Sequence, residues 1–178
     1  MKSSEKGFTI IELAVAIAIL GIVGVAATAT MFQVFQGTGS NDDKMSAIYQ
    51  VQNAGYWITR DAQMSETIAV DGLESPKFIA LTWMEQDFGG GDPVYHSITY
   101  SIEDISDGIG QLMRNHWSSG GLNVDTLIAQ YIYYDTGDPD NTSKATYTSP
   151  LLTVKLNARV LDAEHIGVYS ISRRPNLN

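Results

Sequence analysis

The sequence is organised around the stretch Lys6-Gly7-Phe8-Thr9-Ile10-Ile11-Glu12-Leu13, which opens a long apolar segment. From Phe8 to Phe35 the only charged side chain is that of Glu12, and most other residues are Ala, Ile, Val or Gly. As a helix, these 28 residues would be about 42 Å long, which exceeds the ~30 Å hydrocarbon core of a bilayer. The pattern predicts a helix that crosses a membrane and emerges from it.

Three features distinguish this segment from a simple membrane anchor. Residues 1–7 carry a net charge of only +1, and they end in a small residue, Gly7, that precedes the apolar run. Glu12 lies about one turn inside the run, where a carboxylate is costly unless it has a partner. The amides at the helix N-terminus can supply part of that compensation. From the residue alone, Glu12 is either a cap of the first helical turn or a contact for another molecule.

The quoted stretch resembles the processing and assembly motif of type IV pilins and of the pseudopilins of type II secretion. The resemblance implies that a prepilin peptidase in the membrane cleaves after Gly7 and methylates the new N-terminal amine, that of Phe8. It also implies that Glu12 is the assembly glutamate, whose carboxylate attracts the Phe8 amine of a neighbouring subunit. Such a pair is favourable in a low dielectric, where either charge alone is costly.

An ordinary secretory signal is the alternative. Ala27-Thr28-Ala29 offers a small-x-small cleavage site after the apolar run. The acidic Glu12 at the start of the run and the weakly basic leader both disfavour this alternative.

The expected organisation has three parts. Residues 1–7 are a leader peptide, residues 8–36 a transmembrane and assembly helix, and residues 37–178 one extracytoplasmic domain. Because Lys2 and Lys6 precede the span, the N-terminus is expected in the cytoplasm, with a single pass through the inner membrane. The domain would then be incorporated into a pseudopilus or pilus.

Charge and cysteine content exclude several kinds of site. The net charge is −9, and loss of the +1 leader would leave −10, which repels nucleic acid. The chain has no cysteine, so disulfides, thiolate nucleophiles and cysteine metal ligands are excluded.

Residues 37–41, Gly-Thr-Gly-Ser-Asn, are expected to interrupt the helical pattern. A second, amphipathic helix is predicted over residues 42–69. Its apolar stripe recurs at steps of three and four residues: Met45, Ile48, Val51, Gly55, Ile58 and Ala62. Trp57, Arg60 and Asp61 lie off that stripe, and Arg60-Asp61 is interpreted as a solvated or intersubunit charge pair.

Beyond residue 72 the periodicity changes from about 3.6 to 2, which indicates strands. We expect five or six strands, over residues 78–84, 94–102, 111–117, 123–134, 151–160 and 168–172. The predicted fold class is therefore α+β and pilin-like, with a long, partly transmembrane N-terminal helix packed on an antiparallel β-sheet domain.

Later stretches resemble the J-type minor pseudopilins of type II secretion. They are Ile58-Thr59-Arg60-Asp61, Tyr100-Ser101-Ile102, Gln111-Leu112-Met113-Arg114, Ile132-Tyr133-Tyr134-Asp135 and Ile171-Ser172-Arg173-Arg174-Pro175-Asn176. This resemblance implies partnership with I-type and K-type minor subunits at a filament tip, with the major subunit, and with an inner-membrane assembly platform.

No catalytic constellation is evident, and we expect no enzyme. His96, His116 and His165 are far apart in sequence, and His96 shares a strand face with Val94 and Ile98, as a core histidine does. No nucleophile-elbow motif is present.

One stretch has the composition of a metal loop. It holds four oxygen-bearing side chains that suit calcium: Asp135, Asp138, Asp140 and Asn141. The spacing is not that of an EF-hand, and the same residue types form ordinary turns between strands, so both interpretations stay open. Asn141-Thr142-Ser143 also matches a glycosylation sequon. No other cofactor is expected.

The favoured function is that of a minor pseudopilin of a type II secretion-like system, which primes or caps an assembling filament. The alternatives are a minor or major pilin of a type IV pilus and, from a different class, a signal-anchored extracytoplasmic enzyme or ligand-binding module.

Overall fold

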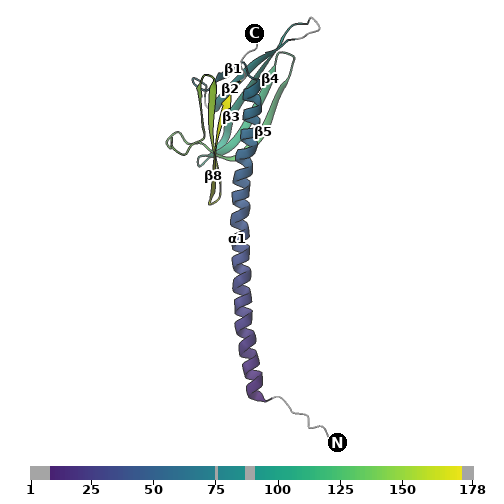
Figure 1. The fold of residues 1–178 in the computed structure, drawn as a ribbon, viewed down its shortest axis with the longest axis vertical. Helices are drawn as coiled ribbons and strands as arrows, with labels where there is room; N and C mark the ends of the chain where they lie inside the picture. Colours follow the sequence, from purple (N-terminus) through teal and green to yellow (C-terminus); the bar gives the residue numbers. More distant parts are fainter. Residues whose placement is uncertain (1–8, 75, 87–90, 174–178) are drawn as a thin grey trace. The chain divides into compact units, whose positions relative to one another are not determined.

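The structure is a computed structural model that describes residues 9–74, 76–86 and 91–173, except for the side chains at positions 35, 36, 38 and 40. It contains one long helix, α1 (Ile10–Met64), followed by strands (Figure 1). The strands are β1 (Thr67–Ala69), β2 (Lys77–Glu85), β3 (Val94–Ser106), β4 (Ile109–Ser118), β5 (Asn123–Tyr133), β6 (Lys144–Thr148), β7 (Leu151–Val160) and β8 (Ala163–Ser172). This is the predicted α+β class. By contacts, the chain divides into two compact units, Met1–Asp42 and Asp43–Asn178.

The first unit is the N-terminal part of α1. Its segment Ile10–Val34 has a mean hydropathy of 2.6 and is the one helical segment, within the described ranges, that is long and apolar enough to cross a membrane. Every described side chain of this segment is exposed. A helix that is apolar on all sides is suited to lipid or to neighbouring helices rather than to water.

The predicted interruption at residues 37–41 is wrong, because α1 continues through them. Each glycine lowers helix propensity by about 1 kcal/mol relative to alanine, but it removes no backbone hydrogen bond. The residue type that does so is proline, and none occurs before Pro76.

The predicted end of the second helix, at residue 69, is also wrong. The helix ends at Met64, where the backbone amide and the hydroxyl of Ser65 both donate to the carbonyl of Ala62. Residues 67–69 instead pair with β2 as the edge strand β1. Three residues are too few to show a period of two, which explains why β1 was missed.

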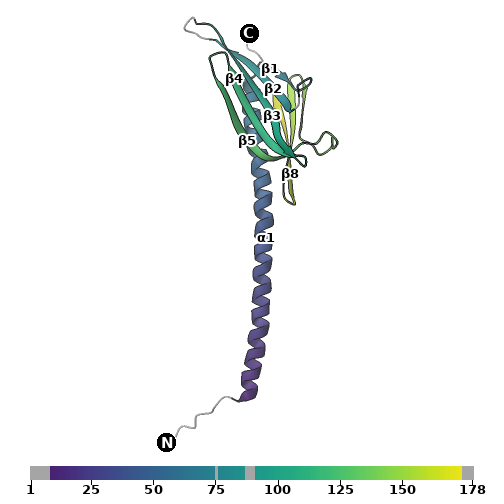
Figure 2. The same cartoon turned by 180° about the vertical axis from the view of Figure 1, so that it is seen from behind.

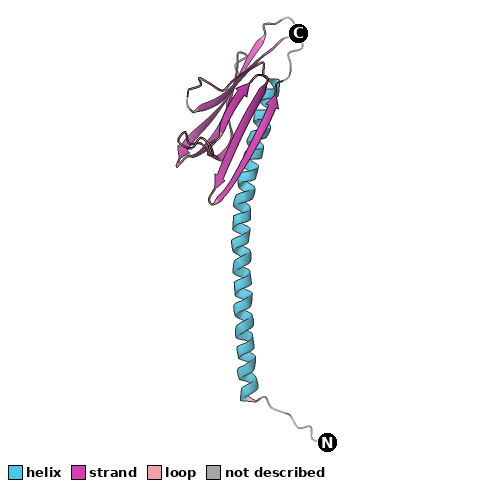
Figure 3. Cartoon of the chain, turned by 60° about the vertical axis from the view of Figure 1, so that its left-hand side comes forward, coloured by secondary structure: helices cyan, strands magenta, loops and turns pink. Residues whose placement is uncertain are grey.

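The strands of the second unit form one antiparallel sheet, in the order β1-β2-β3-β4-β5-β7-β6, with β8 on the other edge of β7. A single residue pair, Ile132 with Ala158, joins β5 to β7. All six predicted strands are present, and the two that were not predicted, β1 and β6, are the shortest. Figures 2 and 3 show β2 to β5 side by side, with the C-terminal part of α1 along one face of the sheet.

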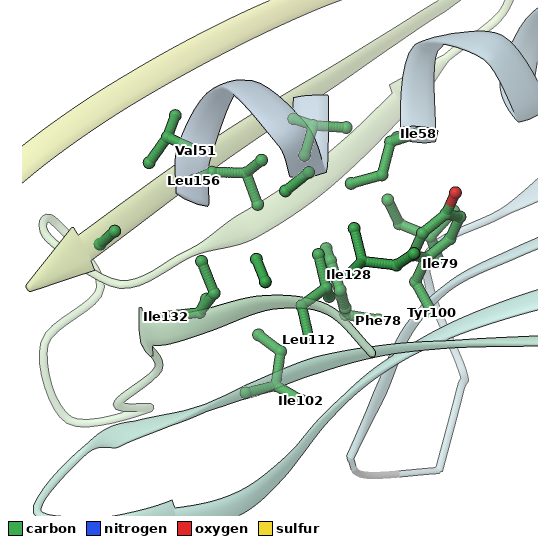
Figure 4. Close-up of a cluster of buried hydrophobic side chains, with 14 of the residues drawn as sticks. Val51, Ile58, Phe78, Ile79, Tyr100, Ile102, Leu112, Ile128, Ile132 and Leu156 are labelled. Atoms are coloured by element: carbon green, nitrogen blue, oxygen red, sulfur yellow. The ribbon is translucent and has the colours of Figure 1, made fainter. Parts of the chain in front are cut away.

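The core lies between that face and residues 47–62 of α1 (Figure 4). The fully buried helix residues are Ala47, Val51, Ala54, Ile58 and Ala62, and the largest buried strand residues include Ile79, Tyr100, Leu112 and Leu156. Burying one such isoleucine or leucine stabilises the fold by about 1.5–3 kcal/mol. The predicted stripe is thus only partly correct, since Met45 is 64% exposed whereas Ala47 and Ala54 are buried. Alanine at these positions lets the helix approach the sheet closely.

Strand β8 makes a close contact with α1. The Tyr169 ring lies on Gly55, where a Cβ atom would collide with it, and the Tyr169 hydroxyl donates to the carbonyl of Val51 over 3.0 Å. A Cβ atom at Gly167 would likewise collide with Val51. Two glycines on facing elements therefore permit this approach.

Candidate assembly site

The predicted processing residues Gly7 and Phe8 lie outside the described residues. The described part of the motif begins at Thr9, directly before the first helical residue, Ile10.

Thr9 and Glu12 form a reciprocal cap at the N-terminus of α1. Both the backbone amide and the hydroxyl of Thr9 donate to Oε2 of Glu12 over 2.9 Å, and the amide of Glu12 donates to Oγ1 of Thr9 over 3.4 Å. This is the capping-box arrangement, which satisfies amides that the first turn of a helix leaves unpaired. The cap uses one carboxylate oxygen; among the described residues, nothing donates a hydrogen bond to the other, Oε1. Capping therefore leaves Glu12 with an oxygen for a further contact.

The apolar part of α1 satisfies its own hydroxyl groups. Thr28 donates to the carbonyl of Gly24 over 2.8 Å, and Thr30 to that of Ala26 over 2.9 Å. Within a bilayer this removes the cost of an unpaired donor.

Two glycines leave room beside the same part of the helix. A Cβ atom added at Gly21 or Gly24 would meet no atom within 4 Å, and both glycines lie on a shallow surface with Val25 and Phe32. Another helix could pack closely there. Ala27-Thr28-Ala29, the possible signal-cleavage site, lies in the interior of α1.

The last turn of α1 is joined to the sheet by a buried ion pair. Asp61 is 1% exposed, and its carboxylate accepts from Nε and Nη2 of Arg114 on β4, over 2.6 and 3.1 Å. The Tyr100 hydroxyl donates to the same carboxylate over 2.5 Å. The interpretation of Arg60-Asp61 as a solvated or intersubunit pair is therefore wrong for Asp61. The buried face of the helix is wider than the predicted apolar stripe, so Asp61 is buried although it lies off that stripe.

This network has clear electrostatic causes. Burial, and then the charge of Asp61, raise the pKa of Tyr100. Burial alone would lower the pKa of Arg114, but its hydrogen bonds and ion pair with Asp61 outweigh burial and raise it. A carboxylate in the last turn also opposes the helix dipole, so Arg114 offsets that cost as well. The guanidinium of Arg114 further lies 5.3 Å from the Trp57 ring. These contacts hold charges in place; none of them presents a reactive group.

The predicted calcium loop is held by its own hydrogen bonds. Asp138 accepts from the side-chain amide of Asn141 over 3.1 Å and from the Tyr133 hydroxyl over 3.2 Å, and the Asn141 bonds come first among the causes that lower its pKa. Asp135 accepts from the amide of Gly137 over 2.8 Å.

Cationic groups contact two backbone oxygens of this loop. The ammonium groups of Lys144 and Lys155 donate to the carbonyls of Pro139 and Asp140. Within the described ranges, no group of three or more His, Asp or Glu side chains is placed to hold a metal ion. The calcium site at Asp135, Asp138, Asp140 and Asn141 stays a prediction; in the structure these residues form the turn between β5 and β6.

The structure brings two of the three histidines together. Nδ1 of His96 and Nε2 of His116 are 3.2 Å apart, whereas His165 lies on β8 opposite Ala158. Sequence reasoning missed this pair because it depends on the β3–β4 register, in which His116 lies opposite Ile98.

Residues 2–28 match the family model of the prokaryotic N-terminal methylation motif. No curated protein and no solved structure matches the chain. The match spans the predicted cleavage position, the Thr9–Glu12 cap and most of the apolar part of α1. The motif supports a type IV pilin-like subunit that is anchored in a membrane, processed by a prepilin peptidase and assembled with other pilins.

Proposed function

We propose that the chain is a structural subunit of a pilus-like filament, held in the cytoplasmic membrane by residues 8–36 until it is assembled. The observation that carries the proposal is the methylation motif at residues 2–28, which is continuous with an exposed apolar helix. Proteins with this motif are structural subunits rather than enzymes, in keeping with a role in assembly.

Glu12 and the amine of Phe8 are the proposed assembly contact. A prepilin peptidase would cut after Gly7 and create that amine, and the carboxylate of Glu12 in one subunit would attract the amine of the next. In the apolar surroundings of packed helices, such a pair is favourable, whereas either charge alone is strongly destabilising. The free Oε1 of Glu12 supports this role, because the Thr9 cap and the intersubunit contact can coexist.

Substitutions at Glu12 test this mechanism. Glu12→Val is expected to leave cleavage intact and to reduce incorporation into sheared filaments by at least about tenfold, since the Phe8 amine loses its partner. Glu12→Gln is more selective, because glutamine keeps the capping box but carries no charge. We expect Glu12→Gln to fail in assembly as well, while Asp42→Val, which removes an exposed carboxylate elsewhere on α1, assembles normally. Wild-type incorporation of both Glu12 variants would mean that Glu12 serves only as a cap.

We further propose that the subunit is a J-type minor pseudopilin of a type II secretion-like system. Three of the stretches that carry this resemblance each contribute one residue to the same buried network: Asp61, Tyr100 and Arg114. Their contact supports the view that the matches in these stretches reflect one structural feature. A tip subunit needs separate surfaces for different partners, whereas a shaft subunit needs two surfaces that join identical copies.

The full chain in detergent is therefore expected to copurify with the I-type and K-type minor subunits. Quantitative mass spectrometry of sheared filaments should find it far below the major subunit. If it were the dominant filament protein, the J-type proposal would be wrong, and a major pilin of a type IV pilus would replace it; the processing and Glu12 results would be unaffected.

A further inference from the structure

A cluster of aromatic and titratable side chains lies on the α1-facing side of the sheet. His96 on β3 stacks on Trp83 of β2, with ring centroids 4.8 Å apart and an interplanar angle of 6°. The His116 ring, on β4, lies 5.7 Å from Trp83 and 5.4 Å from His96. The cluster therefore joins three neighbouring strands through side chains as well as through the backbone.

The contact between the two histidines depends on their protonation. Nδ1 of His96 and Nε2 of His116 lie 3.2 Å apart, so one nitrogen must carry a proton and the other must offer a lone pair. Two neutral rings satisfy this requirement, and so does one protonated ring beside a neutral one. Two protonated rings do not, because both facing nitrogens then carry a proton. The second proton therefore replaces a hydrogen bond with the repulsion of two like charges.

The groups around the pair offset a charge on His116 only in part. Oε2 of Glu85 lies 3.3 Å from Nε2 of His96, but it faces that ring rather than His116. The two groups are close enough for an ion pair but are not aligned as a hydrogen bond, since Nε2 of His96 is buried without a hydrogen-bond partner among the described residues. Glu85 is also largely exposed, which weakens its attraction by solvent screening.

On its own strand, His116 lies two residues from the guanidinium of Arg114. Opposite these two residues, β5 presents uncharged side chains, Val124 and Thr126. From α1 the nearest acid is Asp61, which is already engaged by Arg114 and Tyr100. The charges that act on His116 are therefore those of Arg114 and His96, partly opposed by Asp61. A proton on His116 thus enters a positively charged environment.

We propose that His96 and His116 form an acid-sensitive switch, in which protonation of the second ring breaks their contact and loosens the Trp83-bearing end of β2 and β3 from β4. The same charge repels Arg114, the residue that holds the last turn of α1 on the sheet. Acidification therefore weakens the attachment of α1 to the sheet as well as the strand pairing. The switch is independent of the proposed assembly role, since every residue in it belongs to the unit Asp43–Asn178.

The direction of the pH dependence follows from His116. Burial first, and then the charges of Arg114 and His96, lower its pKa below the ordinary value of 6.5, although Asp61 acts in the opposite sense. The unfolded chain therefore binds a proton at a higher pH than the folded chain does. The stability that neutral His116 contributes is fully present above about pH 6.5. It is lost as the pH falls from there towards the lowered pKa of His116 in the folded state. One linked proton raises the unfolding equilibrium constant by at most about tenfold per pH unit.

Urea unfolding of the full chain in detergent, followed by tryptophan fluorescence from about pH 8 to about pH 5, tests the proposal. The wild-type protein should lose stability below about pH 6.5. His116→Gln cannot take up the proton, so its stability should fall less steeply with pH than that of the wild type. The difference between the two slopes should be close to that of one linked proton. His165→Gln is the matched control, because His165 lies outside the cluster, and it should keep the wild-type slope. A wild-type slope in His116→Gln, or its loss in His165→Gln, would overturn the proposal.

A second measurement covers the case in which His116→Gln does not fold. Ring-proton NMR of the wild-type chain should show that His116 titrates below about pH 6.5, and the indole N–H resonance of Trp83 should shift with the same midpoint. If His116 titrated at or above about pH 6.5, or if Trp83 did not respond, the switch would not exist.

Discussion

At the scale of single residues, two acidic side chains of the long helix have different roles. Glu12 caps an exposed helix end and keeps one oxygen free, whereas Asp61 is buried and fully engaged by Arg114 and Tyr100. The motif predicted a special role for Glu12. Nothing in the local sequence predicted the burial of Asp61, because its partners are 39 and 53 residues away.

Asp61→Asn should destabilise the domain by about 3–5 kcal/mol, since it leaves the guanidinium of Arg114 buried without its counter-charge. Urea unfolding of the full chain in detergent measures this change. Glu164→Gln is the matched control, because it weakens the more exposed ion pair with Arg159 while the glutamine oxygen can still accept from the side-chain amide of Asn157, and it should cost no more than about 1 kcal/mol. Equal effects of the two substitutions would contradict the structural role assigned to Asp61.

At the scale of elements, α1 shows where sequence patterns succeed and where they fail. The apolar run and the positions Val51, Ile58 and Ala62 were predicted correctly from hydrophobicity and a period of 3.6. The predicted interruption at residues 37–41 is absent because turn-forming residues alone do not end a helix. The end of the helix was placed five residues too late because residues 67–69 pair with β2, a long-range contact that local periodicity does not contain.

Gly55 offers a test of the contact between α1 and β8. Alanine normally favours a helix over glycine by about 1 kcal/mol, but at position 55 its Cβ atom would collide with the Tyr169 ring. We therefore expect Gly55→Ala to destabilise the domain by about 1–3 kcal/mol, as overpacking of a core does.

Gly39→Ala is the matched control in the same helix, because no atom lies within 4 Å of the added Cβ position. It should be neutral or slightly stabilising in the same thermal or urea unfolding experiment. If Gly55→Ala were as well tolerated as Gly39→Ala, the packing of β8 on α1 would be incorrect.

At the scale of the whole molecule, the sequence predicted the α+β class, the membrane-compatible helix and six of the eight strands. It did not predict the strand order, and hence the meeting of His96 with His116 or of Asp61 with Arg114. Those contacts depend on register and on the packing of α1 over the sheet, which a pattern along one chain does not encode. The calcium loop stays a prediction; composition identified its oxygen-bearing side chains but not the two lysines that donate to its carbonyls.

The central claim is that the chain is matured as a pilin-like subunit, and its N-terminus tests this most directly. The full chain should be coexpressed with a prepilin peptidase, and the product examined by intact mass and N-terminal sequencing. We predict the loss of residues 1–7 and a new N-terminus at methylated Phe8, with the apolar helix retained. A bulky substitution at Gly7 should block this cleavage. Cleavage near Ala29 instead, with the apolar segment removed, would contradict the pilin-like account and identify that segment as a secretory signal.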